Sequence, residues 1–297
     1  MTEHAELKIY PYKMMKIYSV SFKNLSDMHM FLTSDPEVNR KIFIRQHSLM
    51  GQTEFAGESL EKAVDYLIGG YSGDYEIALR MQKELEKTVI IKESSRQREK
   101  AMAGSHPNVP AYIAGVPKAM YKLQRAKEKK FVTIWFNLAY PVMTSDGAII
   151  NRGALTLSLV SLLEAHGIGV DLKAFTACYC RGEIFISKIG LKSPSELING
   201  KKCFYPMCSR LFLRRVIFRV MESMPFEETE WYPNYGEPMT EDQLRAIFGI
   251  SDNDIVISSP VYMGIGGENI NHDGKRFFKR IELEKYIDIY SKKDSLL

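Results

Sequence analysis

The chain has 297 residues, of which 45% are hydrophobic and 26% are charged, as in an ordinary globular protein with one large or two medium-sized domains. Its 40 basic and 36 acidic residues leave a formal net charge of +4, too small to require a nucleic-acid or anionic-membrane partner. Four cysteines are too few for a disulfide framework, and no apolar run approaches the ~20 residues of a membrane-spanning helix. We therefore expect a cytoplasmic protein with no membrane contact.

The first part of the chain, residues 1–128, is expected to be mostly helical. One apolar stretch, 8–22, is a candidate strand because it is rich in Tyr, Ile, Met and Val. A helix is predicted over 57–71, where Ser59 can cap the N-terminus, apolar residues recur with helical spacing and two glycines follow. A long, highly charged helix is expected to follow over 74–103.

A linker and a basic stretch separate this region from the rest of the chain. The segment 104–117 contains three prolines and two glycines, which favours a loop. Residues 118–130 carry six basic side chains against one acidic side chain, a local net charge of +5. We place a domain boundary near residue 128 and expect a second domain over 129–297.

Strands and helices alternate in this second domain. The apolar run Phe131–Ala139 predicts a strand buried on both faces, followed by a helix over 151–166 and a second strand over 170–178. Further along, the pattern predicts a helix over 207–224 and another buried strand in "DIVISSPVYMG". The alternation predicts an α/β fold with a Rossmann-like, mainly parallel sheet flanked by helices.

The carboxyl ends of such strands are where ligands bind in this class of fold. The loop "NLAYPVMTSDG" leaves one of these ends and leads into a helix N-terminus, which favours anions. A later glycine-rich loop, "GIGGENINHDG", offers backbone amides that can form an anion nest, although the phosphate-loop motif G-x-x-x-x-G-K-[ST] is absent from the sequence. These two loops predict a ligand site formed by Asn137, Asp146, Arg152, Gly264, Gly266 and Gly267.

The order of elements after residue 129 resembles a von Willebrand factor A-like domain. That family places Asp-x-Ser-x-Ser at this strand end to hold magnesium, and the matching positions here are Asn137, Ala139 and Pro141. Hard cations need charged oxygen ligands, which these three residues do not provide. The resemblance therefore implies the Rossmannoid fold without its metal site, and we expect neither a metal nor a cofactor.

Three segments also resemble an uncharacterised family of tailed-phage proteins. They are "NVPAYIAGVPKAM" (108–120), "NRGALTLSLVSLLEAHG" (151–167) and "PMCSRLFLRRVIFR" (206–219), in this order along the chain. The resemblance implies a phage protein that works in the cytoplasm of an infected bacterium. It implies no activity and no role for any residue.

The segment "SRLFLRRVIFR" places four arginines at helical spacing with no acidic residue between them. Like charges four residues apart repel unless each meets an anion, and arginine forks suit phosphate or carboxylate. One interpretation is a surface that binds phosphates, joined by basic residues of the stretch 118–130; the other is pairing with acidic residues of neighbouring elements. The residues of the predicted surface are Arg210, Arg214, Arg215, Arg219, Lys122, Arg125 and Lys127.

Two further patterns favour structural roles over chemistry. Cys178, Cys180, Cys203 and Cys208 are spaced poorly for zinc and are expected to be small buried side chains. The dipeptide His272-Asp273 is expected to be a polar part of a loop rather than an acid–base pair.

The sequence leaves three functions open and does not decide whether the protein is an enzyme. The first is a non-enzymatic phage-type protein that binds nucleic acid or nucleotide phosphates through the arginine-rich helix. The second is an enzyme that acts on a nucleotide or a phosphorylated small molecule at the strand ends. The third is a protein-interaction module in virion assembly or counter-defence, with another phage or host protein as its partner.

Overall fold

The computed structural model describes most of the chain, and the statements below refer to these described residues: 4–34, 58–71, parts of 73–123, 131–165, 168–180, 183–196, 198–224, 238–283 and 289–291.

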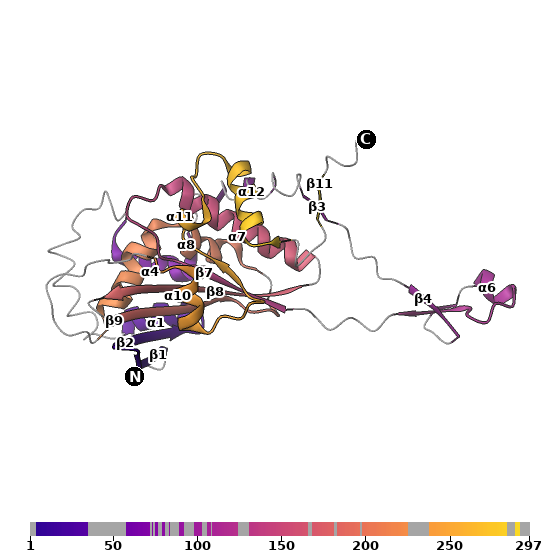
Figure 1. Cartoon of the computed structure of the whole chain (residues 1–297), viewed down its shortest axis with the longest axis horizontal. Coiled ribbons are helices and arrows are strands. Elements are labelled where there is room, and N and C mark those ends of the chain that lie inside the picture. The colour runs from indigo at the N-terminus through magenta and orange to yellow at the C-terminus, as the bar shows by residue number, and fades with distance from the viewer. Residues whose placement is uncertain are drawn as a thin grey trace.

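A six-stranded sheet with helices packed against it forms the centre of the fold (Figure 1). Its strand order is β1-β2-β9-β8-β7-β10. The pairs β2–β9, β7–β8 and β7–β10 are parallel, whereas β1–β2 and β8–β9 are antiparallel. The expected α/β class is confirmed, with a mixed, mostly parallel sheet. The strands are β1 (Glu6–Tyr12), β2 (Met15–Phe22), β7 (Phe131–Asn137), β8 (Gly169–Cys180), β9 (Glu183–Lys192) and β10 (Ile255–Ile257).

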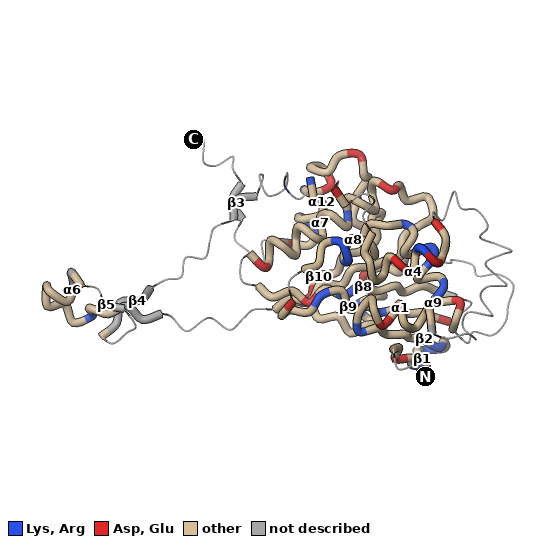
Figure 2. Tube along the Cα trace, turned by 180° about the vertical axis from the view of Figure 1, so that it is seen from behind, with Lys and Arg blue, Asp and Glu red and all other residues tan. Residues whose placement is uncertain are grey.

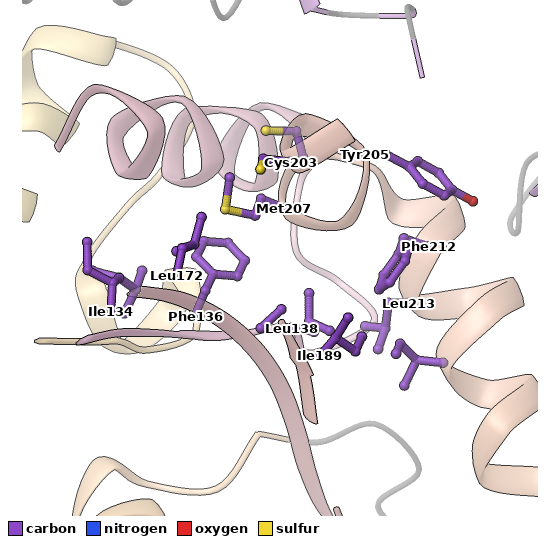
Figure 3. Close-up of a cluster of buried hydrophobic side chains, with 14 of the residues drawn as sticks. Ile134, Phe136, Leu138, Leu172, Ile189, Cys203, Tyr205, Met207, Phe212 and Leu213 are labelled. Atoms are coloured by element: carbon purple, nitrogen blue, oxygen red, sulfur yellow. The ribbon is translucent and has the colours of Figure 1, made fainter. Parts of the chain in front are cut away.

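The main core lies between one face of this sheet and a layer of helices. In Figure 3, Ile134, Phe136 and Leu172 of the sheet point toward Met207 of a covering helix. The helices of the described chain include α1 (Leu25–Ser34), α4 (Leu60–Gly69), α7 (Asp146–Ala165), α8 (Gly200–Cys208), the π-helix η1 (Phe212–Ile217), α9 (Phe218–Glu222), α10 (Glu241–Phe248), α11 (Pro260–Met263) and α12 (Ile270–Arg280).

The α7 helix is apolar on nearly every side because it is buried in this core. It is long and apolar enough to cross a membrane, but 72% of its apolar window is buried inside the protein, as in the core helix of a globular domain. A second, smaller core covers the opposite face of the sheet, where Leu244 and Phe248 of α10 pack near Phe175 and Trp135.

The N-terminal strands belong to the same sheet as the later ones. β2 runs parallel to β9, with Val20 opposite Ser187, and β1 pairs with β2 as a hairpin. The mostly helical character expected for residues 1–128 is therefore not confirmed, and a boundary near residue 128 does not separate these strands from the rest of the sheet. The predicted helix start at Ser59 is confirmed, because its side chain accepts a hydrogen bond from the Lys62 amide at 3.4 Å.

The prediction of a long charged helix over 74–103 is wrong for the second half of that range. That range contains β3 (Val89–Ile91), which pairs with β11 (Ile289–Ser291), and β4 (Arg98–Ala101). The β-branched run Val-Ile-Ile favours a strand over a helix, which the charge pattern had concealed. β4 joins β6 (Met120–Leu123) and β5 (His106–Pro107) in a three-stranded sheet, and α6 (Val109–Ile113) lies between β5 and β6 along the chain.

Candidate functional site

The candidate site lies at the carboxyl ends of β7 and β10. These parallel strands are paired so that Phe136 lies opposite Ile257, and each is followed by a polar residue, Asn137 in β7 and Ser258 after β10. The residues 138–145, which we call the β7–α7 loop, then lead to the start of α7. This edge is where an α/β sheet of this kind binds ligands.

Arg152 is the central residue of the site. It lies in the second turn of α7 and is 0% exposed, with its guanidinium carbon 4.4 Å from the centre of the Phe136 ring. Its Nη1 donates a hydrogen bond to the Ser258 carbonyl oxygen at 3.0 Å. Burial lowers the pKa of Arg152 to about 10, so the side chain is still charged at neutral pH. In the described part of the chain no carboxylate pairs with this charge.

Tyr140 of the β7–α7 loop lies beside this arginine and beside a second one. Its ring centre is 5.9 Å from the guanidinium carbon of Arg152 and 6.0 Å from that of Arg214. Burial raises the pKa of the Tyr140 hydroxyl to about 12, against the opposing effect of the nearby arginines. The hydroxyl therefore keeps its proton at neutral pH and can donate a hydrogen bond.

Several buried polar atoms at this edge have no hydrogen-bond partner among the described residues. Besides the Thr144 hydroxyl, five lie at or next to the two strand ends or in the second turn of α7: the side-chain nitrogen of Asn137, the Tyr140 hydroxyl, the Nε of Arg152 and the hydroxyls of Ser258 and Ser259. The Asn137 amide is held in place because its oxygen accepts a hydrogen bond from the Ala139 amide at 3.0 Å. Buried polar groups are nearly always paired in folded proteins, so five such atoms at one edge are unusual. We call these five residues the donor cluster, because each unpaired atom can donate a hydrogen bond.

Arg210, predicted to bind phosphate, instead holds the β7–α7 loop in place. Its Nε donates to the Asp146 carboxylate at 2.8 Å, and its two Nη atoms donate to the carbonyl oxygens of Val142 at 3.3 Å and Thr144 at 2.5 Å. This arrangement agrees with the interpretation that the arginine pairs with an acidic residue of a neighbouring element. Asp146, predicted as a ligand-site residue, is thus the partner of Arg210.

The other arginines of this segment are buried and do not form an exposed basic surface. Arg214, Arg215 and Arg219 are 6%, 7% and 3% exposed. The Nε of Arg215 donates to the Glu58 carbonyl oxygen at 3.1 Å, and the guanidinium carbon of Arg214 lies 5.0 Å from the Phe218 ring centre. Their spacing in the sequence suggested one face of an α-helix, whereas residues 212–217 form a π-helix covered by the rest of the protein.

The remaining residues of the predicted basic surface lie elsewhere. Lys122 is in β6, opposite Glu99 of β4. Arg125 and Lys127 lie outside the described residues.

The glycine-rich loop after α11 is occupied by a carboxylate of the chain itself. The amides of Gly266 and Gly267 donate to Asp273 at 3.1 and 2.9 Å, and the Asn151 side chain donates to the same carboxylate at 2.8 Å. Asp273 is only 2% exposed, so it is a buried anchor rather than the polar loop residue we expected. Of the three glycines predicted to form an anion nest, Gly266 and Gly267 thus already bind a carboxylate, whereas the Gly264 amide donates to the Val261 carbonyl oxygen at 3.3 Å.

Close packing explains the glycines of this loop. Gly267 has a φ of +89°, and a side chain there would meet the backbone nitrogen of Ala148 at 2.2 Å, at the start of α7. Ser145 joins the two elements, since its hydroxyl accepts from the Ala148 amide and donates to the Gly266 carbonyl oxygen, both at 3.2 Å. The loop therefore supports α7 and, through it, Arg152.

Among the described residues, the cysteines and other metal-binding side chains form no second site. Cys178, Cys203 and Cys208 are buried, as expected of small apolar side chains. Within the described ranges, no group of three or more His, Cys, Asp or Glu side chains is placed to hold a metal ion.

The site that the structure assembles overlaps only partly with the predicted one. Asn137 and Arg152 were predicted, whereas Tyr140, Ser258 and Ser259 were missed. The two serines carry no motif, but they directly follow a buried apolar run, "IVI", and thus a predicted strand end. That position was the signal available in the sequence.

Comparison with known proteins places most of the chain in one family. A family profile described as "Domain of unknown function (DUF7192)" matches residues 3–285, which extends over both sides of the boundary expected near residue 128. No curated protein and no solved structure matches the chain. The match says nothing about a phage origin or a relationship to von Willebrand factor A-like domains. The chain belongs to the DUF7192 family.

Proposed function

We propose that this protein binds the phosphate group of a small molecule, such as a nucleotide, through the donor cluster at the carboxyl ends of β7 and β10. The observation that carries the proposal is Arg152, a fully buried cation without a carboxylate partner in the described chain. Removing a charge from water costs several kcal/mol per ion, and proteins normally offset this cost by pairing. A bound anion would supply the missing charge.

The composition of the cluster favours phosphate over a carboxylate. Five groups, from Asn137, Tyr140, Arg152, Ser258 and Ser259, need hydrogen-bond acceptors. A phosphate group presents three strong acceptor oxygens, whereas a carboxylate presents two. The cluster contains no carboxylate of its own that would repel a dianion. Arginine is the side chain best suited to phosphate among those that proteins use.

The proposal concerns binding and includes no catalytic step. Two acidic side chains that lie in α7 or contact it, Asp146 and Asp273, already have partners, since Asp146 pairs with Arg210 and Asp273 accepts from the amides of the glycine loop and from Asn151. Tyr140 is protonated at neutral pH and cannot act as a base. The strand-end hypothesis is thus favoured over an exposed arginine helix that binds nucleic acid, because Arg214, Arg215 and Arg219 are buried.

A von Willebrand factor A-like, Rossmannoid architecture is part of the same proposal. It is supported by the parallel arrangement of β7, β8 and β10 and by the position of α7 directly after β7. The phage relationship, the cytoplasmic location and a role in virion assembly or counter-defence stay predictions from the sequence alone.

Thermal unfolding in the presence of phosphate compounds tests the proposal. Purified protein in a phosphate-free buffer would be heated with orthophosphate and with nucleoside mono-, di- and triphosphates. A ligand at 100 times its Kd stabilises the folded state by about 2.7 kcal/mol, which gives a clear rise in melting temperature. Arg152→Met should abolish this rise.

Lys192→Met is the matched control for that substitution. Lys192 is also a buried cation, but its Nζ contacts Glu164 at 2.5 Å and donates to the Val170 carbonyl oxygen at 3.1 Å. The control should be less stable than the wild type and still respond to the ligand. The proposal fails if no phosphate compound shifts the melting temperature of the wild type, or if Arg152→Met responds as strongly as the wild type.

A further inference from the structure

The turn around α6 exposes an apolar surface that the phosphate-site proposal does not use. Val109, Tyr112, Ile113 and Val116 are 55%, 73%, 79% and 44% exposed. The stretch 109–117, "VPAYIAGVP", contains no charged residue, and in Figure 2 the trace around α6 is tan. We call this stretch the α6 tip. Several large apolar side chains exposed together mark an interaction surface more often than isolated ones do.

Along the sequence, the positive charge of the chain is concentrated in the segment that contains this tip. Residues 98–130 contain eight basic and two acidic side chains, a net charge of +6. Because the whole chain has a net charge of +4, the remaining residues together carry −2. Lys118, which directly follows the tip, is exposed. The small total charge thus hides a basic segment, with a net charge of +1 over residues 98–108 before the tip and +5 over residues 118–130 after it.

We infer that the α6 tip docks on the surface of an anionic lipid bilayer. An interface of this kind stabilises both features at once, because apolar side chains enter the boundary of the acyl chains while basic side chains contact the negative headgroups. A nucleic acid would instead need basic side chains at the point of contact, and nine consecutive residues of the tip have none. The inference concerns attachment to a membrane surface, independently of the phosphate site, and it differs from the expectation drawn from total charge.

Vesicle flotation tests the inference on the full chain. The protein would be mixed with vesicles of phosphatidylcholine alone and with vesicles that also contain phosphatidylglycerol. It should float with the second kind and not with the first, and added salt should weaken binding because exposed charges are screened. Tyr112→Ser combined with Ile113→Ser should reduce binding roughly tenfold or more, since two large apolar side chains no longer enter the interface.

A matched double variant on another exposed apolar turn is the control. Val261 and Tyr262 of α11 are 61% and 45% exposed, so Val261→Ser with Tyr262→Ser removes similar side chains from a different surface. The control should bind vesicles like the wild type, and circular dichroism would verify that both double variants are folded.

Three outcomes would overturn the inference. The first is no flotation with the anionic vesicles at low salt, and the second is unchanged flotation of the tip variant. The third is that the tip is needed for binding of single-stranded DNA, or for self-association in light scattering, while vesicle binding is absent. The tip would then bind a nucleic acid or a second copy of the chain.

Discussion

The substitution Arg152→Met removes a buried charge and keeps a long, flexible side chain, so its effect on stability without ligand tests the basis of the proposed function. Burial lowers the pKa of Arg152 from 12.5 to about 10. At ~1.4 kcal/mol per pH unit, holding the charged form in the folded state costs about 3 kcal/mol at any pH well below 10. The sign is unfavourable to folding, because the unfolded chain binds this proton more tightly.

Methionine removes that cost but also loses two favourable contacts of the arginine. The hydrogen bond to the Ser258 carbonyl oxygen is worth roughly 1–2 kcal/mol, and the stacking on Phe136 is worth about 1 kcal/mol. We therefore expect the variant to lie between no change and about 1 kcal/mol more stable than the wild type, in line with other buried charges replaced by apolar side chains. Urea unfolding at pH 7 in a phosphate-free buffer measures this difference.

The control substitution should change stability in the opposite direction. Lys192→Met leaves Glu164 and two carbonyl oxygens without their partner, and we expect a loss of about 2–4 kcal/mol. A loss of more than ~2 kcal/mol for Arg152→Met as well would refute the reasoning. It would mean that the protein itself satisfies Arg152 and that no anion is needed.

Three other substitutions test neighbouring parts of the site. Arg210→Met should raise amide hydrogen exchange in the β7–α7 loop by roughly tenfold, because three hydrogen bonds to that loop are lost; unchanged exchange would show that Arg210 does not hold it. Asp273→Asn should cost about 2–3 kcal/mol in urea unfolding, since two glycine amides and an asparagine lose their charged acceptor, whereas the exposed Asp252→Asn should be neutral. Tyr140→Phe should leave the absorbance titration of the folded protein unchanged up to about pH 10, because burial raises the pKa of this tyrosine to about 12. If the variant had one fewer ionising tyrosine than the wild type near pH 10, the burial of Tyr140 would be contradicted.

The parts of the fold that follow from local pattern were predictable. The continuous apolar run of β7 indicates a buried strand, and the capping residue Ser59 indicates the start of a helix. Each of these signals depends on residues that are close together in the chain. The strands in the charge-rich stretch before α6 could not be predicted in this way, since they pair with distant segments such as β11. Pairing between distant strands leaves little local signal.

The candidate site was only half predictable for the same reason. Asn137 and Arg152 stand near a recognisable strand end, but Ser258 joins them only through the register of β10 against β7. The arginines of η1 carried a misleading signal, because charged residues at helical spacing usually face solvent and here they are buried. Their burial follows from the apolar residues that flank them.

The hairpin at the N-terminal edge of the sheet has a consequence for solubility. β1 ends the strand order, so one side of its backbone has no neighbouring strand in the described sheet. It carries Pro11, which has no backbone N–H to donate to a new strand. It also carries the charged pair Glu6 and Lys8, with 2.7 Å between the Glu6 Oε1 and the Lys8 Nζ. The strand behind it, β2, has no proline and is mostly buried. By covering β2, β1 keeps a pairing-competent strand away from other molecules and protects the protein against aggregation from this edge.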